Sequence, residues 1–95
     1  MPFTSTSHVT SERASIYLQQ LCKHFGHKVS VDFDADIGRI DLPFGTCDLQ
    51  AGSDVLTLNV TGAEADIARL EKVIGDHLAR FAFRENPAIA WTDTA

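Results

Sequence analysis

The segment LCKHFGHK, residues 21–28, places one thiol and two imidazoles within six positions. Thiolate and imidazole are common zinc ligands, so the segment could contribute half of a metal site. On a helix each residue turns by about 100°, so Cys22 and His24 point about 200° apart and cannot bind one ion together. Gly26 should end the helix and separate His27 from both. The spacing therefore argues against a metal site and leaves His24, beside a helix end, as a candidate contact for a ligand.

Cys47 lies in a segment where apolar residues alternate, in phase with Leu49 and Ala51. This period of two predicts a strand whose cysteine faces the core, where a thiol is normally an inert small apolar group. A catalytic thiol needs a lowered pKa and a neighbouring base. His24 or His77 could supply that base only if the fold brought it to Cys47. A small thiol- or metal-dependent enzyme using these residues is therefore kept as an alternative.

Another histidine lies in the segment DHLARFAFRE, at the edge of an apolar stripe. His77, Arg80 and Arg84 share one flank of the predicted helix and could form a small cationic groove for a carboxylate. The two arginines could equally pair with acidic strands, as surface charges commonly do. With His24 and Cys47, these three side chains make up the candidate ligand-binding residues. The sequence assigns no catalytic residue.

Three aspartates, Asp32, Asp34 and Asp36, have the D-x-D-x-D spacing with which a calcium-binding loop begins. Such a loop requires glycine at its sixth position and glutamate at its twelfth, where this chain has Ile37 and Pro43. We therefore expect a solvated hairpin turn here, and no calcium site.

Two amphipathic helices are predicted from apolar residues that recur every three or four positions. The first should be capped by Thr10 or Ser11 and should end at Gly26, which we expect in the left-handed conformation. The second should open with a capping box in the segment TGAE, residues 61–64, and run to about Arg84. The apolar stripe of the first helix is Ala14, Tyr17, Leu18, Leu21 and Phe25, and that of the second is Ile67, Leu70, Ile74, Leu78 and Phe81.

Between the helices the apolar period changes to two. Four alternating segments over residues 29–60, separated by ADIG, PFG and GSD, predict a meander of antiparallel hairpins. Gly38 is expected to supply a positive φ for the first turn. The segment FTSTSHV, residues 3–9, is rich in β-forming residues and predicts a further edge strand. We therefore expect a single α+β domain over residues 1–95: an antiparallel sheet of four to five strands covered on one face by two helices, in the order β-α-β-β-β-β-α.

The chain has a net charge of −5 that is unevenly spread. Residues 32–54 contain six aspartates and a single basic residue, Arg39. Without a basic stripe, binding to nucleic acid or to an acidic membrane surface is disfavoured. An acidic sheet face could instead dock a basic protein, so an interaction module is a further alternative. The chain shows no secretory leader, no apolar run long enough to span a bilayer and no framework spacing of its two cysteines, so we expect a cytoplasmic protein.

Three segments, TSERASIYLQQLCKHFGHK, GRIDLPFGTCDLQA and DHLARFAFRE, together resemble a bacterial family known as domain of unknown function 2218. The resemblance extends over about residues 8–91, and the family carries cysteine and histidine at the positions of Cys22, His24, Cys47 and His77. Members of that family are small, stand alone or are joined to siderophore-interacting flavoproteins, and often lie beside iron-uptake genes. The resemblance thus implies a supporting role in iron or siderophore metabolism, with a flavoprotein as a candidate partner.

Together these observations predict a non-enzymatic accessory or ligand-binding domain with no cofactor and no metal. The expected ligand is a small carboxylate or a siderophore-type molecule. We expect it near His24 and His77, where the long helix meets the sheet.

Overall fold

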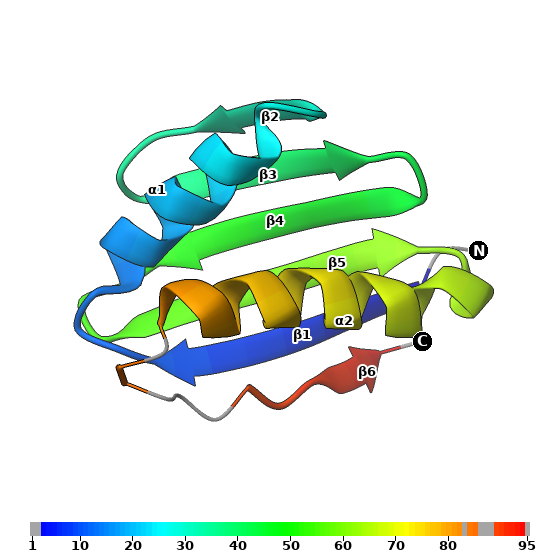
Figure 1. Ribbon diagram of the computed structural model, residues 1–95. Helices are drawn as coiled ribbons and strands as arrows, with labels where there is room; N and C mark the ends of the chain where they lie inside the picture. The colour runs from blue at the N-terminus through cyan, green and yellow to red at the C-terminus, as the bar shows by residue number, and fades with distance from the viewer. Residues whose placement is uncertain (1–2, 83, 86–88, 95) are drawn as a thin grey trace.

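The computed structural model describes residues 3–82, 84–85 and 89–94, and it shows a two-layer α+β fold (Figure 1). The predicted order β-α-β-β-β-β-α is confirmed, and one short strand that was not predicted follows it. The elements are β1 (Phe3–Thr10), α1 (Ala14–Phe25), β2 (Ser30–Phe33), β3 (Ile37–Leu42), β4 (Gly45–Ala51), β5 (Val55–Gly62), α2 (Glu64–Phe81) and β6 (Thr92–Thr94).

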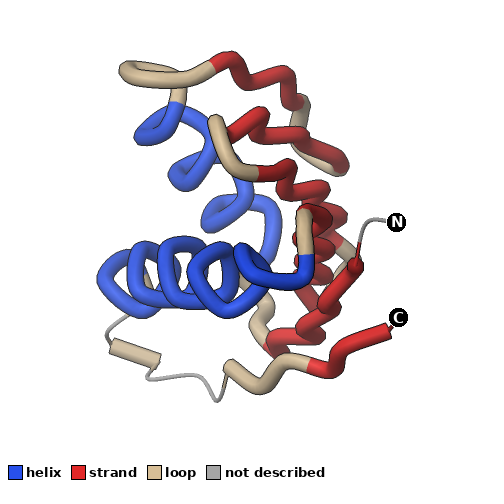
Figure 2. Tube along the Cα trace, turned by 90° about the vertical axis from the view of Figure 1, so that its right-hand side faces the viewer, coloured by secondary structure: helices blue, strands red, loops and turns tan. Residues whose placement is uncertain are grey.

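The strands form one antiparallel sheet in the order β2-β3-β4-β5-β1-β6. Strand β1, predicted at an edge, lies between β5 and β6, because the last described residues pair with it. Both helices lie on the same face of the sheet, as the view in Figure 2 shows. Helix α1 packs over β2 to β5, and α2 packs over β1, β4 and β5. We call the other face, which neither described helix covers, the outer face.

Alternation in the strands decides which side chains enter the core. In β3, β4 and β5 every second residue is buried beneath the helices, and the polar residues between them point to the outer face. The predicted division into one apolar face and one polar face is therefore correct. The fully buried aliphatic side chains are Val9, Leu18, Leu21, Ile40, Leu56, Leu58, Val60, Leu70, Ile74 and Leu78.

Two glycines allow α2 to approach the sheet closely. Gly45 and Gly62 are cross-strand partners in β4 and β5. A Cβ on Gly45 would lie 2.5 Å from the carbonyl oxygen of Thr61 and 2.7 Å from Leu70. Any larger residue at Gly45 would therefore collide with the backbone and with a core side chain.

Gly38 makes room for a helix and does not form a turn. The prediction of a positive φ is wrong, because Gly38 lies within β3 and has an ordinary strand conformation. The preceding turn is closed by the carboxylate of Asp34, which accepts the N–H groups of Asp36 and Ile37 at 2.7 and 2.9 Å. A Cβ on Gly38 would lie 2.8 Å from Sγ of Cys22, so its absence lets α1 pack against β3.

Neither predicted N-terminal cap forms. Helix α1 follows Arg13 and α2 follows Ala63, both without a side-chain cap. Ser11 Oγ instead accepts the N–H of Arg13 at 3.0 Å and donates to the carboxylate oxygens of Glu85 at 3.0 and 3.1 Å. The hydroxyl of Tyr17 donates to the same carboxylate. This shared carboxylate ties the start of α1 to the segment after α2.

The first helix ends before Gly26 as predicted, but the conformation of Gly26 and the end of the second helix differ from the prediction. Gly26 is right-handed, with φ −60° and ψ −16°, and its N–H donates to the carbonyl oxygen of Cys22 at 2.8 Å. The backbone therefore continues its turn past α1 and does not reverse at Gly26. Helix α2 ends at Phe81, short of Arg84. Within the described ranges, neither helix is long and apolar enough to cross a bilayer.

Candidate functional site

The last turn of α1 meets the C-terminal part of α2 at a pair of histidines. The ring centroids of His24 and His77 lie 4.8 Å apart, with 44° between the ring planes. Phe25 lies 4.8 Å from His77, and Phe81 lies 5.8 Å from His24, again between centroids. We call these four side chains the histidine cluster. The fold thus brings together two histidines that the sequence could only place on separate helices.

Hydrogen bonding fixes the orientation of one imidazole. Nδ1 of His77 lies 2.6 Å from the carbonyl oxygen of Val73, one turn earlier on α2. Because a carbonyl oxygen only accepts, Nδ1 must carry a proton and donate it. Nε2 of the half-buried His77 is therefore the ring nitrogen that remains for another partner.

The charged and titratable side chains that act on His24 are all basic. Its pKa is lowered, first by partial burial of the ring and then by His77, His27, Lys28 and Arg80. All four neighbours are cationic or can become so, and no acidic side chain among the described residues contributes to the shift. Within the same part of the chain, no group of three His, Cys, Asp or Glu side chains is arranged to hold a metal ion. A bound anion would relieve the repulsion at His24, whereas a cation would increase it.

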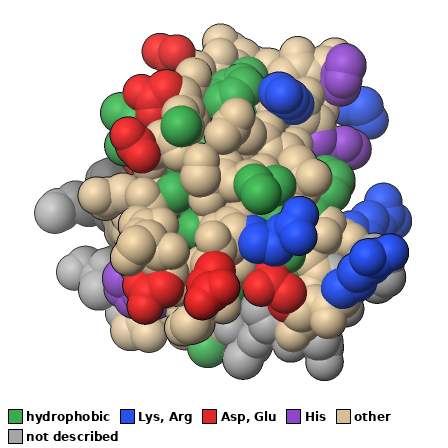
Figure 3. Space-filling view, turned by 90° about the vertical axis from the view of Figure 1, so that its left-hand side faces the viewer, with side chains coloured by type: hydrophobic (Ala, Val, Ile, Leu, Met, Phe, Trp, Pro, Cys, Tyr) green, Lys and Arg blue, Asp and Glu red, His purple; other side chains and the backbone are tan. Residues whose placement is uncertain are grey.

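The two candidate arginines occupy different positions. Arg80 is exposed on α2, one turn after His77, whereas Arg84 is exposed beyond the end of that helix. The predicted shared helical flank therefore ends before Arg84. Figure 3 shows Lys and Arg side chains, with histidines beside them, toward the helical side on the right, and acidic side chains along the left and the bottom.

Cys47 is not positioned to contact a ligand, and its inclusion among the candidate contacts is corrected here. It is 0 % exposed in β4, between its cross-strand partners Ile40 and Val60. Burial raises the pKa of its thiol far above the ordinary value. Cys22 on α1 is also 0 % exposed, and burial raises its pKa to about 11. Because a nucleophilic thiol must be accessible and partly ionised, an enzyme built on Cys47 has no geometric support.

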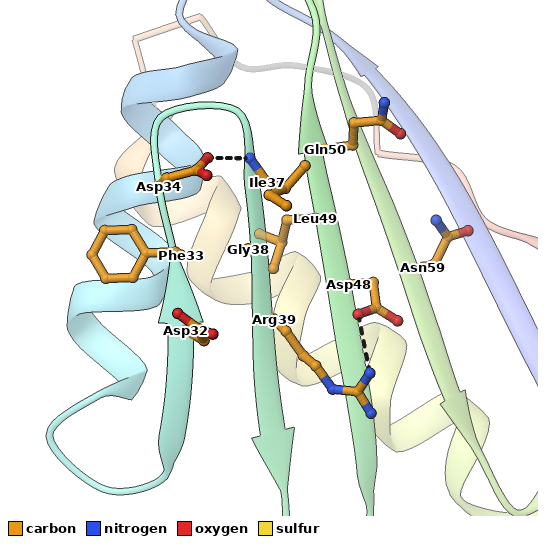
Figure 4. A pocket seen from close by; sticks show the side chains of 10 residues that line it. All are labelled: Asp32, Phe33, Asp34, Ile37, Gly38, Arg39, Asp48, Leu49, Gln50 and Asn59. Carbon is orange, nitrogen blue, oxygen red and sulfur yellow. Dashed lines mark hydrogen bonds and ion pairs between the residues drawn. The ribbon is translucent and has the colours of Figure 1, made fainter.

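A second site, which sequence reasoning missed, lies on the outer face of the sheet. A hollow of about 520 Å³ opens over β2, β3, β4 and β5 (Figure 4). Its polar lining includes one cross-strand row in which Asp32, Arg39, Asp48 and Asn59 are successive partners. Ile37, whose side chain is 58 % exposed, adds an apolar contact. We call this region the outer-face hollow.

The cation of the outer-face hollow is already paired. Nε of Arg39 donates to Asp41 at 3.2 Å, and a terminal nitrogen lies 3.8 Å from Asp48. The hydrogen bond to Asp41 is the main reason that the pKa of Arg39 is raised, and the charge of Asp48 is the next. The carboxylate of Asp32, the other cross-strand partner of Arg39, has no hydrogen bond or ion pair within the described part of the chain.

One sequence signal could have pointed to the outer-face hollow. Ile37 is a large apolar residue that precedes the buried positions Gly38 and Ile40, and alternation alone places it on the polar face. An apolar side chain among outward aspartates is a local inconsistency of the kind that marks a contact site.

Comparisons with known proteins support the fold and the family. A family model described as "Uncharacterized protein conserved in bacteria (DUF2218)" matches residues 6–92. Among solved structures, the chain is similar to the NMR structure of PA4090 from Pseudomonas aeruginosa, with a TM-score of 0.80 and 40% sequence identity over 95% of each chain. A comparison with curated proteins gives no match. The ligand has to be inferred from the side chains of this chain.

Proposed function

The chain belongs to the bacterial DUF2218 family, and we propose that it is a non-enzymatic binding domain whose ligand presents a carboxylate to the histidine cluster. In this proposal Arg80 of α2 donates to the carboxylate, and His77 donates from Nε2 in its doubly protonated form, because its Nδ1 already donates to Val73. His24 approaches it from the end of α1.

The observation that carries this proposal is the convergence of two helices on one pair of imidazoles. His24 is exposed and His77 is half-buried, so a ligand can reach both rings from solvent. The hydrogen bond from His77 to Val73 holds one of the two rings in place before any ligand arrives. A site that is ordered in advance loses less conformational entropy on binding.

Charge favours an anion over other ligand classes. Lys28 and Arg80 place two further positive charges near His24, and the ring of His27 lies near it as well. Hydrogen bonds between a carboxylate and a charged donor are among the stronger ones in proteins, at about 1.5–3 kcal/mol each. Two such bonds would contribute roughly 3–6 kcal/mol, which corresponds to a dissociation constant of roughly 6 mM to 40 μM for a carboxylate that accepts from Arg80 and His77.

The aromatic members of the histidine cluster further restrict the class of ligand that would fit. Phe25 and Phe81 lie against the two imidazoles; Phe25 is buried, and the partly exposed Phe81 offers an apolar surface beside the charges. A molecule with a carboxylate next to a planar or apolar body would use both parts. Siderophore-type chelators include such molecules, and we propose iron or siderophore metabolism, with a flavoprotein partner, on this chemical basis and on the family resemblance.

The proposal can be tested by titrating ¹⁵N-labelled protein with citrate, alone and as its Fe(III) complex, and with an aryl carboxylate such as 2,3-dihydroxybenzoate. We expect saturable NMR shifts at the end of α1 and in the C-terminal part of α2. Arg80→Gln and His77→Gln should each weaken binding about tenfold, the effect of one lost charge-assisted hydrogen bond. Lys72→Gln is the matched control, because Lys72 is an exposed cation of the same helix that pairs with Asp76 at 3.1 Å.

Two results would contradict the proposal. One is the absence of saturable shifts with all three compounds at millimolar concentration. The other is equal weakening by Arg80→Gln, His77→Gln and Lys72→Gln, which would indicate general attraction to positive charge without a site.

A further inference from the structure

The outer-face hollow has a volume of about 520 Å³, which is within the range of small-molecule sites, roughly 300–1,000 Å³. We infer that it is a second binding site, for a small organic cation that carries an ammonium or guanidinium group on an apolar body. This site lies on the face of the sheet opposite the helices, and the inference does not depend on the function of the histidine cluster.

The charges that line the outer-face hollow select a cation. Asp32, Asp34 and Asp48 contribute three carboxylates and Arg39 contributes one guanidinium, which leaves a net charge of −2. Arg39 is held by Asp48 and by Asp41, so its charge is largely neutralised within the protein. In Figure 4, Arg39 extends toward Asp48 and away from Asp32. The carboxylate of Asp32 therefore faces the hollow without a protein partner in the described part of the chain.

The opposite wall of the hollow supplies neutral polar groups. Asn59 Oδ1 accepts the hydroxyl of Thr6 at 2.6 Å, which orients the NH₂ group of this amide away from Thr6. Gln50 on β4 lines the same wall and is exposed. Amides at these positions can hydrogen-bond a polar group at the far end of a ligand whose cation contacts Asp32.

An apolar contact completes the site. Ile37 is 58 % exposed although its strand neighbours on this face are polar. Contact with water does not stabilise the exposed isoleucine side chain. The methylene groups of an aliphatic cation would cover it and gain about 25 cal/mol for each Å² of apolar surface removed from water.

Butylguanidinium and butylurea form a matched pair of probes, because they have nearly the same shape and differ in charge. We expect butylguanidinium to give saturable amide shifts in β2, β3 and β4, and butylurea to bind at least about tenfold more weakly, as expected for one charge-assisted hydrogen bond. Asp32→Asn should weaken butylguanidinium binding about tenfold. Asp54→Asn, which removes the same charge outside the hollow, should change it less than about twofold.

Four results would overturn this inference. Butylurea could shift the same amides with equal affinity, Asp32→Asn could bind like the unmodified protein, or the shifts could spread over all acidic residues without saturating. A lysine-rich peptide that binds the outer face while butylguanidinium does not would assign the face to a protein partner and would also overturn it. Citrate binding in Asp32→Asn serves as an independent readout of the histidine cluster, so the two proposals can fail separately.

Discussion

Replacing Gly38 with alanine should destabilise the protein because of one specific contact. The added Cβ would lie 2.8 Å from Sγ of Cys22, and 3.2 Å from both Cδ2 of Leu18 and Cβ of Phe33. Cys22 and Leu18 are both 0 % exposed, so neither side chain can move into solvent to relieve the contact. The backbone of Gly38 imposes no further penalty, because its φ is not in the left-handed region.

The size of the effect follows from two opposing contributions. An extra methyl group in a packed core costs about 1–3 kcal/mol, and replacing glycine by alanine regains about 0.4–1 kcal/mol by restricting the unfolded chain. Gly38→Ala should therefore lower the free energy of unfolding by up to about 2.6 kcal/mol. Cys22→Ala removes a buried sulfur and should cost about 1–2 kcal/mol. In the double variant the new methyl group enters the space left by the sulfur, so the combined loss should be smaller than the sum by about 0.5–2 kcal/mol.

Urea unfolding followed by circular dichroism measures all four members of this cycle, provided that the slope m stays constant. Gly75→Ala is the matched control, because a Cβ there would lie 3.7 Å from Nε1 of Trp91, an ordinary contact. It should stabilise α2 by about 0.5–1 kcal/mol. Losses for Gly38→Ala and Cys22→Ala that add within about 0.3 kcal/mol would refute the reasoning, because independent sites add.

Three further predictions concern buried or shifted groups. In thermal or urea unfolding, Ser7→Ala should leave the free energy of unfolding unchanged or raise it by about 1 kcal/mol, because the Ser7 hydroxyl is buried without a partner among the described residues. Ser5→Ala should instead lower it by about 1 kcal/mol, because the Ser5 hydroxyl donates to the carboxylate of Glu71 on α2. The pKa of His24 in an NMR titration should lie below 6.5 and should rise in His77→Gln. The folded state disfavours the histidinium, so the contribution of His24 to stability is complete above about pH 6.5. That contribution declines as the pH falls through the lower pKa of the folded state. Iodoacetamide should not label Cys47 in the folded protein at pH 8 and should label it in urea, and rapid labelling of the folded form would contradict its burial.

Periodicity predicted the fold well because it reports burial directly. The alternating segments became β3, β4 and β5, and the stripe over Ala14 to Phe25 became α1. Single residues that commonly mark the ends of helices and the positions of turns predicted the structure less reliably. Ser11 is a residue type that often caps helices, but its hydroxyl donates to the carboxylate of Glu85, which is distant in sequence. Glycine often occurs in turns, but Gly38 lies in a strand, where the close packing of Cys22 on α1 leaves no room for a side chain.

The sites were harder to predict because they depend on distances between elements. His24 and His77 are far apart in sequence, and only the packing of α1 beside α2 on one face of the sheet brings their ring centroids to 4.8 Å from each other. The row of Asp32, Arg39 and Asp48 requires the register of three strands, which turn lengths set and residue types do not. Burial of Cys47, in contrast, followed from its phase in the strand and needed no long-range information.

The opposite charges of the two proposed sites lead to different salt dependences. The whole chain carries a net charge of −5, so a cation approaching the outer-face hollow is attracted by both the local and the overall field. A carboxylate approaching the histidine cluster is attracted locally and repelled by the molecule as a whole. At 0.1 M salt the screening length is about 10 Å, shorter than the smallest extent of the protein, 20 Å. Salt should therefore remove the overall repulsion of the carboxylate and the overall attraction of the cation, so that butylguanidinium loses more affinity than citrate between low and moderate ionic strength.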